Sequence, residues 1–429
     1  MVKKTFKYTH VGRLPEDWDC LQAIEVIDEI SMGPFGSDIT VSNFVSSGVP
    51  VLNGYNVSQI MLIDKFQNFV TPKKAKELKK AVAHRGDIIV THRGTIGQVS
   101  YIPDSSAYSE YVISQSQFRV HFNDKRVNSH FLVSYLLSPI GQKYLLETKG
   151  HTGVPALAQP TTNFRRLWIP LPEIAEQVAI AEALSNVDSL ISSLQKLIEK
   201  KKAIKQGAMQ ELLTGQKRFL GFSGEWETRK VGELCSIVTK QTGFDYTSTI
   251  KPNLIEHPQS NALPMIQTKN FVGRKFNFST DYYIPTDIAK EFDKIVLDTV
   301  CLLFSIVGAS VGNIGLFPGD KVAFCGGAIG IAKFYHEIDA IYAFYYFLSE
   351  SGQQQIRNVT KGGAQATVTI EDIREFTIPY PNLKERALIA QTLSDMDSEI
   401  EQQEKKLAKY QQIKQGMMQE LLTGRIRLV

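Results

Sequence analysis

The chain lacks the features of membrane proteins and of disulfide-rich secreted proteins. No apolar run reaches the ~18 residues of a membrane span, and the basic N-terminus MVKKTFKYTH has no apolar signal-peptide core. The four cysteines, Cys20, Cys235, Cys301 and Cys325, include no C-x-x-C pair. We therefore expect a cytoplasmic protein with free, buried thiols, no metal site and no membrane partner.

Sequence motifs of common enzymes are missing as well. The chain has no H-E-x-x-H, G-x-S-x-G or Walker sequence, no methyltransferase-type Asn/Asp-Pro-Pro-Tyr/Phe tetrapeptide and no paired-carboxylate nuclease signature. The eight histidines are scattered, and an isolated histidine on a strand or turn is more often structural than catalytic. These absences predict a binding component with no catalytic residue and no cofactor in this chain.

An internal repeat is the most informative feature that is present. The string IKQGAMQELLTG at 204–215 recurs as IKQGMMQELLTG at 413–424, and IPLP at 169–172 aligns with IPYP at 378–381. The segments between the repeats hardly resemble each other. A period of about half the chain therefore indicates a protein built twice, from two similar connectors and two dissimilar modules.

The repeats predict two long helices. Apolar residues recur at steps of four and three, and the helices begin after prolines and end near Gly215 and Gly424. An ordinary amphipathic helix is the alternative, but polar stretches such as EKKK at 199–202 favour a coiled coil. Gly207 and Gly416 inside the pattern suggest close backbone approach or a local break. The predicted helix–helix seam consists of Ile180, Leu184, Val187, Ile191, Leu194, Ile198, Ile389, Leu393, Met396, Ile400 and Leu407.

The modules have mixed α/β sequence patterns, which gives an α+β fold class overall. We expect four segments: module 1–168, helix 169–215, module 216–377 and helix 378–429. Helices are expected at 128–147 and 339–357. Strands are expected at Val49–Leu52, Asp87–Thr91, Phe118–Phe122, Leu263–Gln267, Thr299–Phe304 and Ile329–Phe334. If each module faces its own helix in the same way, the chain imitates a two-fold symmetric dimer.

A glycine-rich turn recurs in the two modules. RGTIG at 93–97 parallels GASVG at 308–312, each after an apolar strand. The turn lacks the Lys-Ser/Thr of a phosphate-binding P-loop, so a plain strand-to-strand turn is one interpretation. A DNA-facing turn is the other, because glycine lets the backbone approach a phosphate closely.

The repeated helices carry the pattern E-x-x-x-I-A-x-x-L-S-x-x-D-x-x-I, which is followed by Q-x-L-L-T-G. This pattern resembles the specificity subunits of Type I restriction-modification systems over essentially the whole length. It is filled by Glu176, Ile180, Leu184, Asp188 and Ile191, and by Glu385, Ile389, Leu393, Asp397 and Ile400.

The resemblance implies two target recognition domains, each reading one half of a bipartite double-stranded DNA target. It also implies an antiparallel pair of spacer helices that sets the distance between the halves. Two DNA adenine methyltransferase subunits would dock on the helices, and restriction subunits would join them for host defence. S-adenosylmethionine, ATP and Mg²⁺ would then belong to these partner subunits.

Base edges are usually read by polar side chains on loops. On that basis the DNA-binding candidates in the first module are Ser37, Asn53, Tyr55, Arg93, Thr95, Gln115 and His151. Those in the second module are Gln241, Thr242, Gln267, Lys269, Asn270, Ser310, Lys361 and Gln365.

Two rival hypotheses remain: a standalone DNA-modifying enzyme, and a coiled-coil scaffold whose β-rich heads bind protein. Steep weakening of DNA binding by salt would argue against the scaffold.

Overall fold

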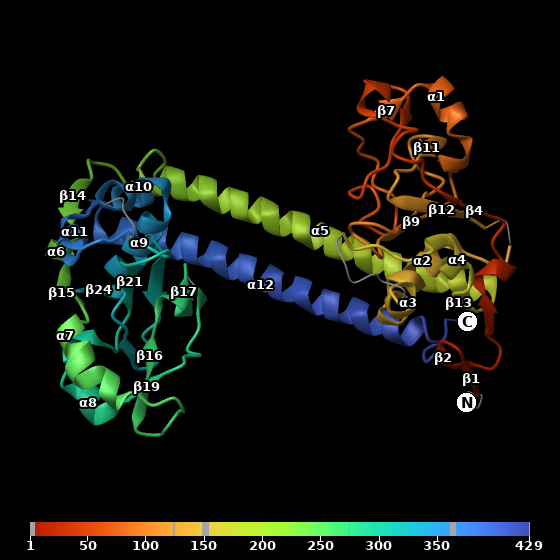
Figure 1. The fold of residues 1–429 in the computed structure, drawn as a ribbon. Helices are drawn as coiled ribbons and strands as arrows, with labels where there is room; N and C mark the ends of the chain where they lie inside the picture. Colours follow the sequence, from red (N-terminus) through yellow and green to blue (C-terminus); the bar gives the residue numbers. More distant parts are fainter. Residues whose placement is uncertain (1–4, 123–124, 148–153, 274, 361–365, 429) are drawn as a thin grey trace. The chain divides into compact units, whose positions relative to one another are not determined.

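The computed structural model describes residues 5–122, 125–147, 154–273, 275–360 and 366–428. The chain forms two compact units, which we call unit 1 (Met1–Gln195 with Lys406–Val429) and unit 2 (Lys196–Lys405). Each unit contains one α/β module and parts of both long helices, α5 (Ile174–Leu213) and α12 (Leu383–Leu421) (Figure 1). Each module is thus completed by two helical segments that are far apart in the sequence.

The main sheet of unit 1 is antiparallel, with the strand order β10-β9-β12-β4. Phe118 on the central strand lies opposite Val90 and Met32. Phe118 and Val90 are fully buried and belong to one hydrophobic core with Ile180 and Leu421 of the long helices. The strands are β4 (Glu29–Met32), β9 (Ile88–Thr91), β10 (Val99–Tyr101) and β12 (Gln117–His121).

The main sheet of unit 2 has the same antiparallel arrangement, in the order β15-β24-β21-β22. Its core likewise includes residues from both long helices, such as Leu213 and Leu393. The strands are β15 (Cys235–Lys240), β21 (Cys301–Ser305), β22 (Ile314–Phe317) and β24 (Ile329–Phe334). Two dissimilar sequences therefore build one sheet topology.

A smaller strand system lies beside each main sheet and has its own core. In unit 1 a parallel bridge joins Val51 to Val112, and in unit 2 β16 pairs in parallel with β23. In unit 1 the strands are β5 (Phe44–Val45), β6 (Val49–Pro50), β7 (Phe69–Val70), β8 (Val82–His84) and β11 (Glu110–Val112). In unit 2 they are β16 (Ala262–Ile266), β17 (Phe271–Val272), β18 (Lys275–Phe276), β19 (Tyr283–Pro285), β20 (Val296–Leu297) and β23 (Ala323–Cys325).

The expected strands are all present; Ile329–Phe334 has the expected ends, and the others are shifted by one or two residues. The first is the most shortened: β6 covers only Val49–Pro50, although Val51 N–H still donates to Asn68 O at 2.9 Å. The remaining strands are β1 (Phe6–Thr9), β2 (Gly12–Pro15), β3 (Asp19–Gln22), β13 (Trp168–Leu171), β14 (Glu227–Lys230) and β25 (Thr377–Tyr380). The short helices include α1 (Pro72–Glu77), α4 (Pro160–Arg165), α6 (Val231–Leu234), α7 (Gly243–Asp245), α8 (Thr286–Lys290) and α11 (Ile370–Glu375).

Each of the two expected module helices is divided into two. They are α2 (Ser129–Leu137) with α3 (Pro139–Leu145), and α9 (Glu337–Leu348) with α10 (Glu350–Val359). At each break a serine caps the second helix: Ser138 Oγ accepts from Gly141 N–H, and Ser349 Oγ accepts from Gly352 N–H. A β-carbon on either glycine would collide with a carbonyl of the preceding helix, so both turns require glycine.

The long helices begin and end where the sequence predicts. They start just after the proline pairs, and Gly215 and Gly424 follow their last turns with positive φ angles of 73° and 66°. Neither a local break nor a close approach by another described part of this chain is found at Gly207 and Gly416. Both lie in continuous helix with nothing within 4 Å of an added β-carbon, because this part of each helix surface is exposed.

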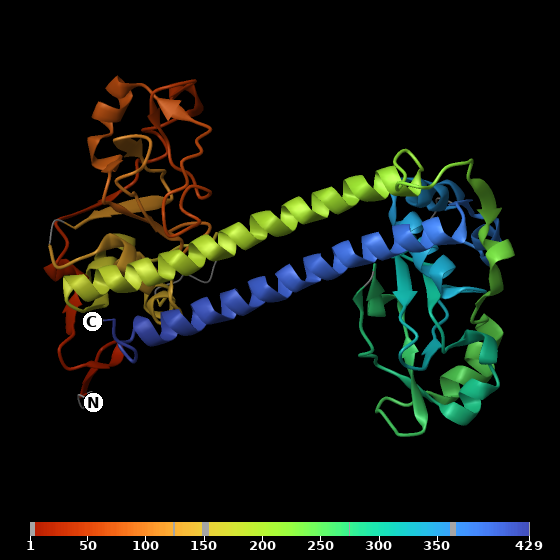
Figure 2. The ribbon, with the colours of Figure 1, turned by 180° about the vertical axis from the view of Figure 1, so that it is seen from behind.

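Within each unit, α5 and α12 run antiparallel. In unit 2, Lys205 Nζ lies 2.6 Å from Asp397 Oδ1. In unit 1, the repeat-equivalent Lys414 Nζ lies 2.6 Å from Asp188 Oδ1. Of the predicted seam residues, the buried ones are Ile180, Leu184, Leu194, Ile198, Ile389, Leu393 and Ile400, whereas Val187, Ile191, Met396 and Leu407 are half-buried. Ile180 and Leu184 belong to the core of unit 1, and Ile389 and Leu393 to that of unit 2. The long helices are continuous in the view from behind (Figure 2).

A buried glutamate on α5 forms hydrogen bonds with residues from the first and the last segments of the chain, both of which belong to unit 1. Glu176 accepts from Trp18 Nε1 at 3.1 Å and from Arg427 Nε at 2.6 Å. Arg427 also donates to Asp17, and this holds the pKa of the Asp17 carboxyl below its ordinary value. The first and last parts of the chain therefore meet in one unit.

Unit 2 contains the equivalent arrangement, with its glutamate one repeat after Glu176 and its arginine one repeat before Arg427. Glu385 accepts from Trp226 Nε1 at 3.2 Å and from Arg218 Nε at 2.8 Å. Both carboxylates are fully buried. We call each set of tryptophan, glutamate and arginine a Trp-Glu-Arg lock.

No helix in the described part of the chain is both long and apolar enough to cross a membrane.

Candidate nucleic-acid interface

Loops at one end of the main sheet of unit 1 bring most of the predicted contact residues together. Gln117 Nε2 donates to Asn53 O at 3.2 Å, so the first residue of β12 holds the loop that carries Tyr55. That loop adjoins the glycine-rich turn, because a β-carbon on Gly54 would lie 3.4 Å from Thr95 Oγ1. A β-carbon on Gly36 would lie 3.1 Å from Gln115 Oε1. These loops, at 33–38, 53–56, 92–98 and 114–117, form the candidate interface of unit 1.

The side chains of this interface are mostly open to solvent. Arg93, Thr95, Gln115 and Ser37 are exposed, Tyr55 is 56% exposed and Asn53 is half-buried. Beneath them, His92 Nε2 lies 3.3 Å from Gln115 O, and burial lowers the pKa of the His92 imidazole. His151 lies outside the described residues. The arrangement presents polar and basic groups on loops that are held by backbone hydrogen bonds.

Equivalent loops gather in unit 2. Gly326 N–H donates to Ile266 O at 2.8 Å, which holds the β23–β24 connection beside Gln267. Ser310 Oγ lies 2.7 Å from Ser305 Oγ at the end of β21. Thr242 and Lys269 are exposed, whereas Gln267 and Ser310 are half-buried. The candidate interface of unit 2 comprises the loops 241–245, 267–270, 307–312 and 326–328; Lys361 and Gln365 lie outside the described residues.

The prediction that Asn270 presents its side chain to DNA is corrected by the structure. Asn270 is only 2% exposed, and its Nδ2 donates to Asn277 O and Ser279 O, both at 2.7 Å. Asn56 is bonded in the same way in unit 1, where it donates to Ile63 O and Lys65 O. Both asparagines hold the loop that carries the exposed candidates, because their amide hydrogens satisfy carbonyls of the next turn.

Gln241 is likewise buried rather than on the surface. It is 3% exposed, and neither Nε2 nor Oε1 has a hydrogen-bond partner. A β-carbon on Gly327 would lie 2.9 Å from Gln241 Oε1, so the side chain lies against the β23–β24 connection. It directly follows β15, whose last ladder pair is Lys240 with Gly330.

The glycine-rich turns are equivalent, with a shift of one residue from the alignment expected. Gly94 N–H donates to Pro155 O and Gly308 N–H to Ala366 O. Gly94, Gly97, Gly308 and Gly312 all have positive φ angles, between 83° and 92°. Gly94 therefore matches Gly308, the second turn is one residue longer, and the counterpart of Arg93 is Val307. These two side chains give the units different chemistry at one place.

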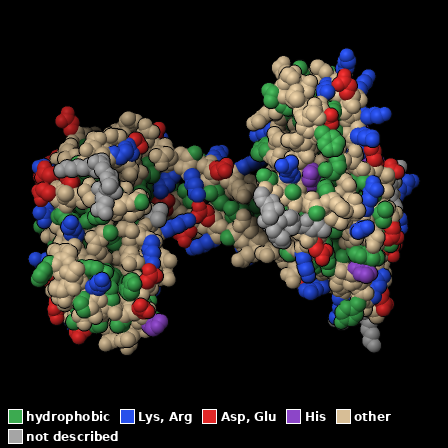
Figure 3. All heavy atoms as spheres, in the orientation of Figure 1, with side chains coloured by type: hydrophobic (Ala, Val, Ile, Leu, Met, Phe, Trp, Pro, Cys, Tyr) green, Lys and Arg blue, Asp and Glu red, His purple; other side chains and the backbone are tan. Residues whose placement is uncertain are grey.

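Sequence reasoning missed two exposed aromatic residues at the interfaces, Phe35 and Phe244. They are 80% and 78% exposed and lie on the loops that follow β4 and β15. The only sequence signal is the adjacent glycine, in GPFG at 33–36 and GF at 243–244. Basic, acidic and apolar side chains are interspersed on the visible face of each unit (Figure 3).

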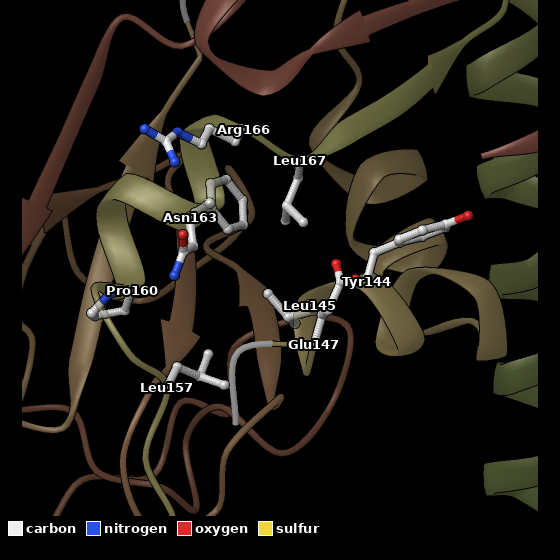
Figure 4. Close-up of a pocket in the computed structure, with 9 residues that line it drawn as sticks. Tyr144, Leu145, Glu147, Leu157, Pro160, Asn163, Arg166 and Leu167 are labelled. Atoms are coloured by element: carbon white, nitrogen blue, oxygen red, sulfur yellow. The ribbon is translucent and has the colours of Figure 1, made fainter. Parts of the chain in front are cut away.

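One small cavity of unit 1, about 210 Å³ in volume, lies between α3 and α4. Figure 4 shows Leu145, Leu157 and Leu167 around it, with the guanidinium of Arg166 directed away from Leu145 and Leu157. It contains none of the predicted contact residues. Among the described residues, no group of three or more His, Cys, Asp or Glu side chains could hold a metal ion.

Comparison with known proteins identifies the class. The family described as the Type I restriction modification DNA specificity domain matches residues 44–206 and 223–410. The chain therefore belongs to this family and carries two copies of its domain, which confirms the resemblance found in the repeats. The copies include most of both modules and parts of both long helices.

Curated relatives and solved structures agree with this assignment. The putative type I restriction enzyme MjaX specificity subunit of Methanocaldococcus jannaschii is 25% identical, covering 99% of this chain and 97% of the relative. The MjaVIII specificity subunit of the same organism is 24% identical, with the same coverage. The crystal structure of a Type-I restriction-modification system S subunit from M. genitalium has a TM-score of 0.60 at 15% identity, and covers 94% of this chain and 96% of that one. The predicted fold and the prediction of a specificity subunit rather than an enzyme are confirmed.

Proposed function

We propose that this chain reads a bipartite double-stranded DNA target, with one half-site for each unit. The observation that carries the proposal is the pairing of one loop scaffold with two sets of side chains. Arg93 in unit 1 is replaced by Val307 in unit 2, and the buried asparagines hold loops that differ in their exposed residues, Tyr55 and Lys269. An invariant scaffold with divergent contact residues suits two unlike half-sites.

We further propose that each unit docks one DNA adenine methyltransferase subunit on its long helices. Ile204 and Ile413, one repeat apart, are 52% and 39% exposed although both are apolar. Three residues on, and so on the same helix face, Gly207 and Gly416 leave open space. The same exposed isoleucine and the same uncovered glycine thus occur on both long helices, which suits two copies of one partner. A partner helix can approach a glycine closely.

In this proposal the chemistry lies in the partners. The methyltransferase subunits bind S-adenosylmethionine and flip the target adenine out of the stack for N6 methylation. Restriction subunits, with ATP and Mg²⁺, join the assembly and supply the nuclease. This chain contributes the register of the complex on DNA, since its two interfaces fix where each partner meets its half-site.

Methylation mapping by single-molecule sequencing tests the proposal. Cells would express this chain with its neighbouring methyltransferase gene, and matched cells would lack the chain. We expect a bipartite N6-methyladenine motif with a fixed gap that disappears without the chain. If no motif depends on the chain, DNA binding by the purified complex is measured from 50 to 200 mM salt. Affinity that does not fall over this range would favour the protein-binding scaffold instead.

Two rearranged chains test how the halves and the gap are encoded. Exchanging residues 1–160 for another family member's first module should change one half-site only. Inserting one or two helical turns before Gly207, with matching turns in α12, should change only the gap. A module exchange that altered both half-sites would contradict the assignment of one reader per half.

A further inference from the structure

Each unit presents a solvent-exposed phenylalanine beside its candidate interface. Phe35 and Phe244 are 80% and 78% exposed. A phenylalanine usually buries most of its ring, because the ring has no polar atom to satisfy in water. A single exposed aromatic residue needs no explanation. Two exposed phenylalanines at corresponding places in modules of dissimilar sequence do need an explanation.

The two positions correspond through the main sheets. Met32 is the last residue of β4 and lies opposite Phe118, and Gly33 N–H then donates to Gln117 O at 2.8 Å. In unit 2 the last ladder pair of β15 is Lys240 with Gly330. Phe35 follows the end of its strand by three residues, and Phe244 follows by four. The same strand end therefore projects an aromatic ring in both units.

Local hydrogen bonds hold both loops in place. Phe35 N–H donates to Asp38 Oδ2 at 3.0 Å, and Asp38 N–H donates back to Phe35 O at 2.9 Å. In unit 2, Thr242 Oγ1 and Asp245 Oδ2 lie 2.6 Å apart, and Asp245 N–H donates to Thr242 Oγ1 at 3.1 Å. Each ring is thus carried by a closed turn, so little backbone entropy is lost when the ring is captured.

An exposed polar side chain adjoins the loop that carries each ring. In unit 1, Gly36 directly follows Phe35 and lies against the exposed Gln115. In unit 2, Thr242 is exposed on the same turn as Phe244. A flat apolar ring inside a polar surface does not match a phosphate backbone. It matches the face of an unstacked base or a gap between two base pairs, where apolar side chains act as wedges.

We propose that Phe35 and Phe244 are base-step wedges, each inserting its ring between neighbouring bases of the half-site read by its own unit. The wedge deepens the proposed function and rests on it. Insertion would open a step near the adenine that a partner subunit extrudes, and it would favour pyrimidine–purine steps, which unstack most easily. Each ring is therefore a specificity-determining group that makes no hydrogen bond to a base.

The test uses the full chain in complex with its methyltransferase subunits and a duplex that carries the mapped methylation motif. The variants are Phe35→Ala, Phe244→Ala and Phe35→Trp. The matched control is Tyr335→Ala, since Tyr335 is 66% exposed in unit 2 and bonds to Leu234, at the strand end opposite to Phe244. The probe base 2-aminopurine replaces bases next to, but never at, the methylated adenines, so its fluorescence reports unstacking.

We expect each alanine variant to weaken DNA binding roughly 5- to 150-fold, the range for loss of one aromatic–base stack. Each should also abolish the fluorescence rise in one half-site only. Phe35→Trp should keep both properties, and Tyr335→Ala should change neither. Scrambling the half-site read by unit 1 should remove the effect of Phe35→Ala on affinity.

Two results would overturn the wedge. One is an affinity within about twofold of wild type for both alanine variants, with no fluorescence rise in the wild-type complex. The other is normal DNA affinity with poor recovery of the methyltransferase subunits, which would make the rings protein contacts. By contrast, a wild-type complex that does not prefer the motif over a scrambled duplex would refute the proposed DNA reading itself.

Discussion

Arg427 is the most informative single side chain to remove from unit 1. In the Arg427→Ala variant, the Glu176 carboxylate still accepts from Trp18 Nε1 and from the N–H of Leu428. It loses the two hydrogen bonds donated by Arg427, of 2.6 and 2.8 Å. The Glu176 side chain is fully buried, whereas the Arg427 side chain is 19% exposed. Removing one member of a buried ion pair costs about 3–5 kcal/mol. Water can enter where the arginine was, so we expect the lower end, about 3 kcal/mol.

The effect should be confined to one unit. For a unit of about 200 residues, this cost corresponds to a fall in Tm of roughly 6–12 °C. Hydrogen exchange read by mass spectrometry would assign the loss, since the amides of unit 1 should lose protection while those of unit 2 keep it. Arg218→Ala is the matched control, because it removes the equivalent donor from Glu385 and should produce the reverse pattern.

A double variant isolates the physical cause. In Glu176→Gln/Arg427→Ala the buried group is neutral, so roughly half of the lost stability should return. A single Arg427→Ala variant that cost under about 1 kcal/mol, or that lowered protection equally in both units, would refute the reasoning. The first result would mean that the carboxylate is solvated, and the second that the lock does not belong to unit 1 alone.

Three further predictions concern the helices and the pH dependence. Gly207→Ala and Gly416→Ala should each raise the free energy of unfolding in urea by about 0.5–1 kcal/mol, because both glycines are helical with open space around them. Leu393→Ala should lower the stability of unit 2 by about 2–5 kcal/mol in the same assay, since this side chain is fully buried. Burial lowers the pKa of His92 and His130 below the ordinary value near 6.5, so the unfolded chain binds protons that the folded chain does not. Unit 1 should therefore lose stability as the pH falls from 7.5 through 6.5, and glutamine at both positions should flatten this dependence.

The long helices could be predicted because their signal is local and occurs twice. Prolines, the heptad pattern and the closing glycines all lie within one segment, and the structure places the helix ends accordingly. The turns at Ser138 and Ser349 could not be predicted in the same way. They depend on a glycine that must pass close to the preceding helix, and this contact is visible only once the backbone is folded.

The candidate interfaces were only partly predictable for a related reason. Loop composition identified Arg93 and Thr95, which are exposed. It could not show that Asn270 and Gln241 are buried. Gln241 lies against the distant β23–β24 connection, and the carbonyls that Asn270 bonds are brought to it only when the following turn folds. Nor could it show that Phe35 is exposed, since an isolated phenylalanine usually indicates a core position.

The two Trp-Glu-Arg locks have a consequence for the inheritance of specificity. Each lock joins a module to the helix repeats, through Trp18 and Trp226 on the module side and through Glu176 and Glu385 on the helix side. Recombination between the repeats would therefore bring an incoming module to a helix that already carries the matching partners. A gene of this design can replace one module by another without changes to the module–helix contact, provided that the new module keeps its tryptophan.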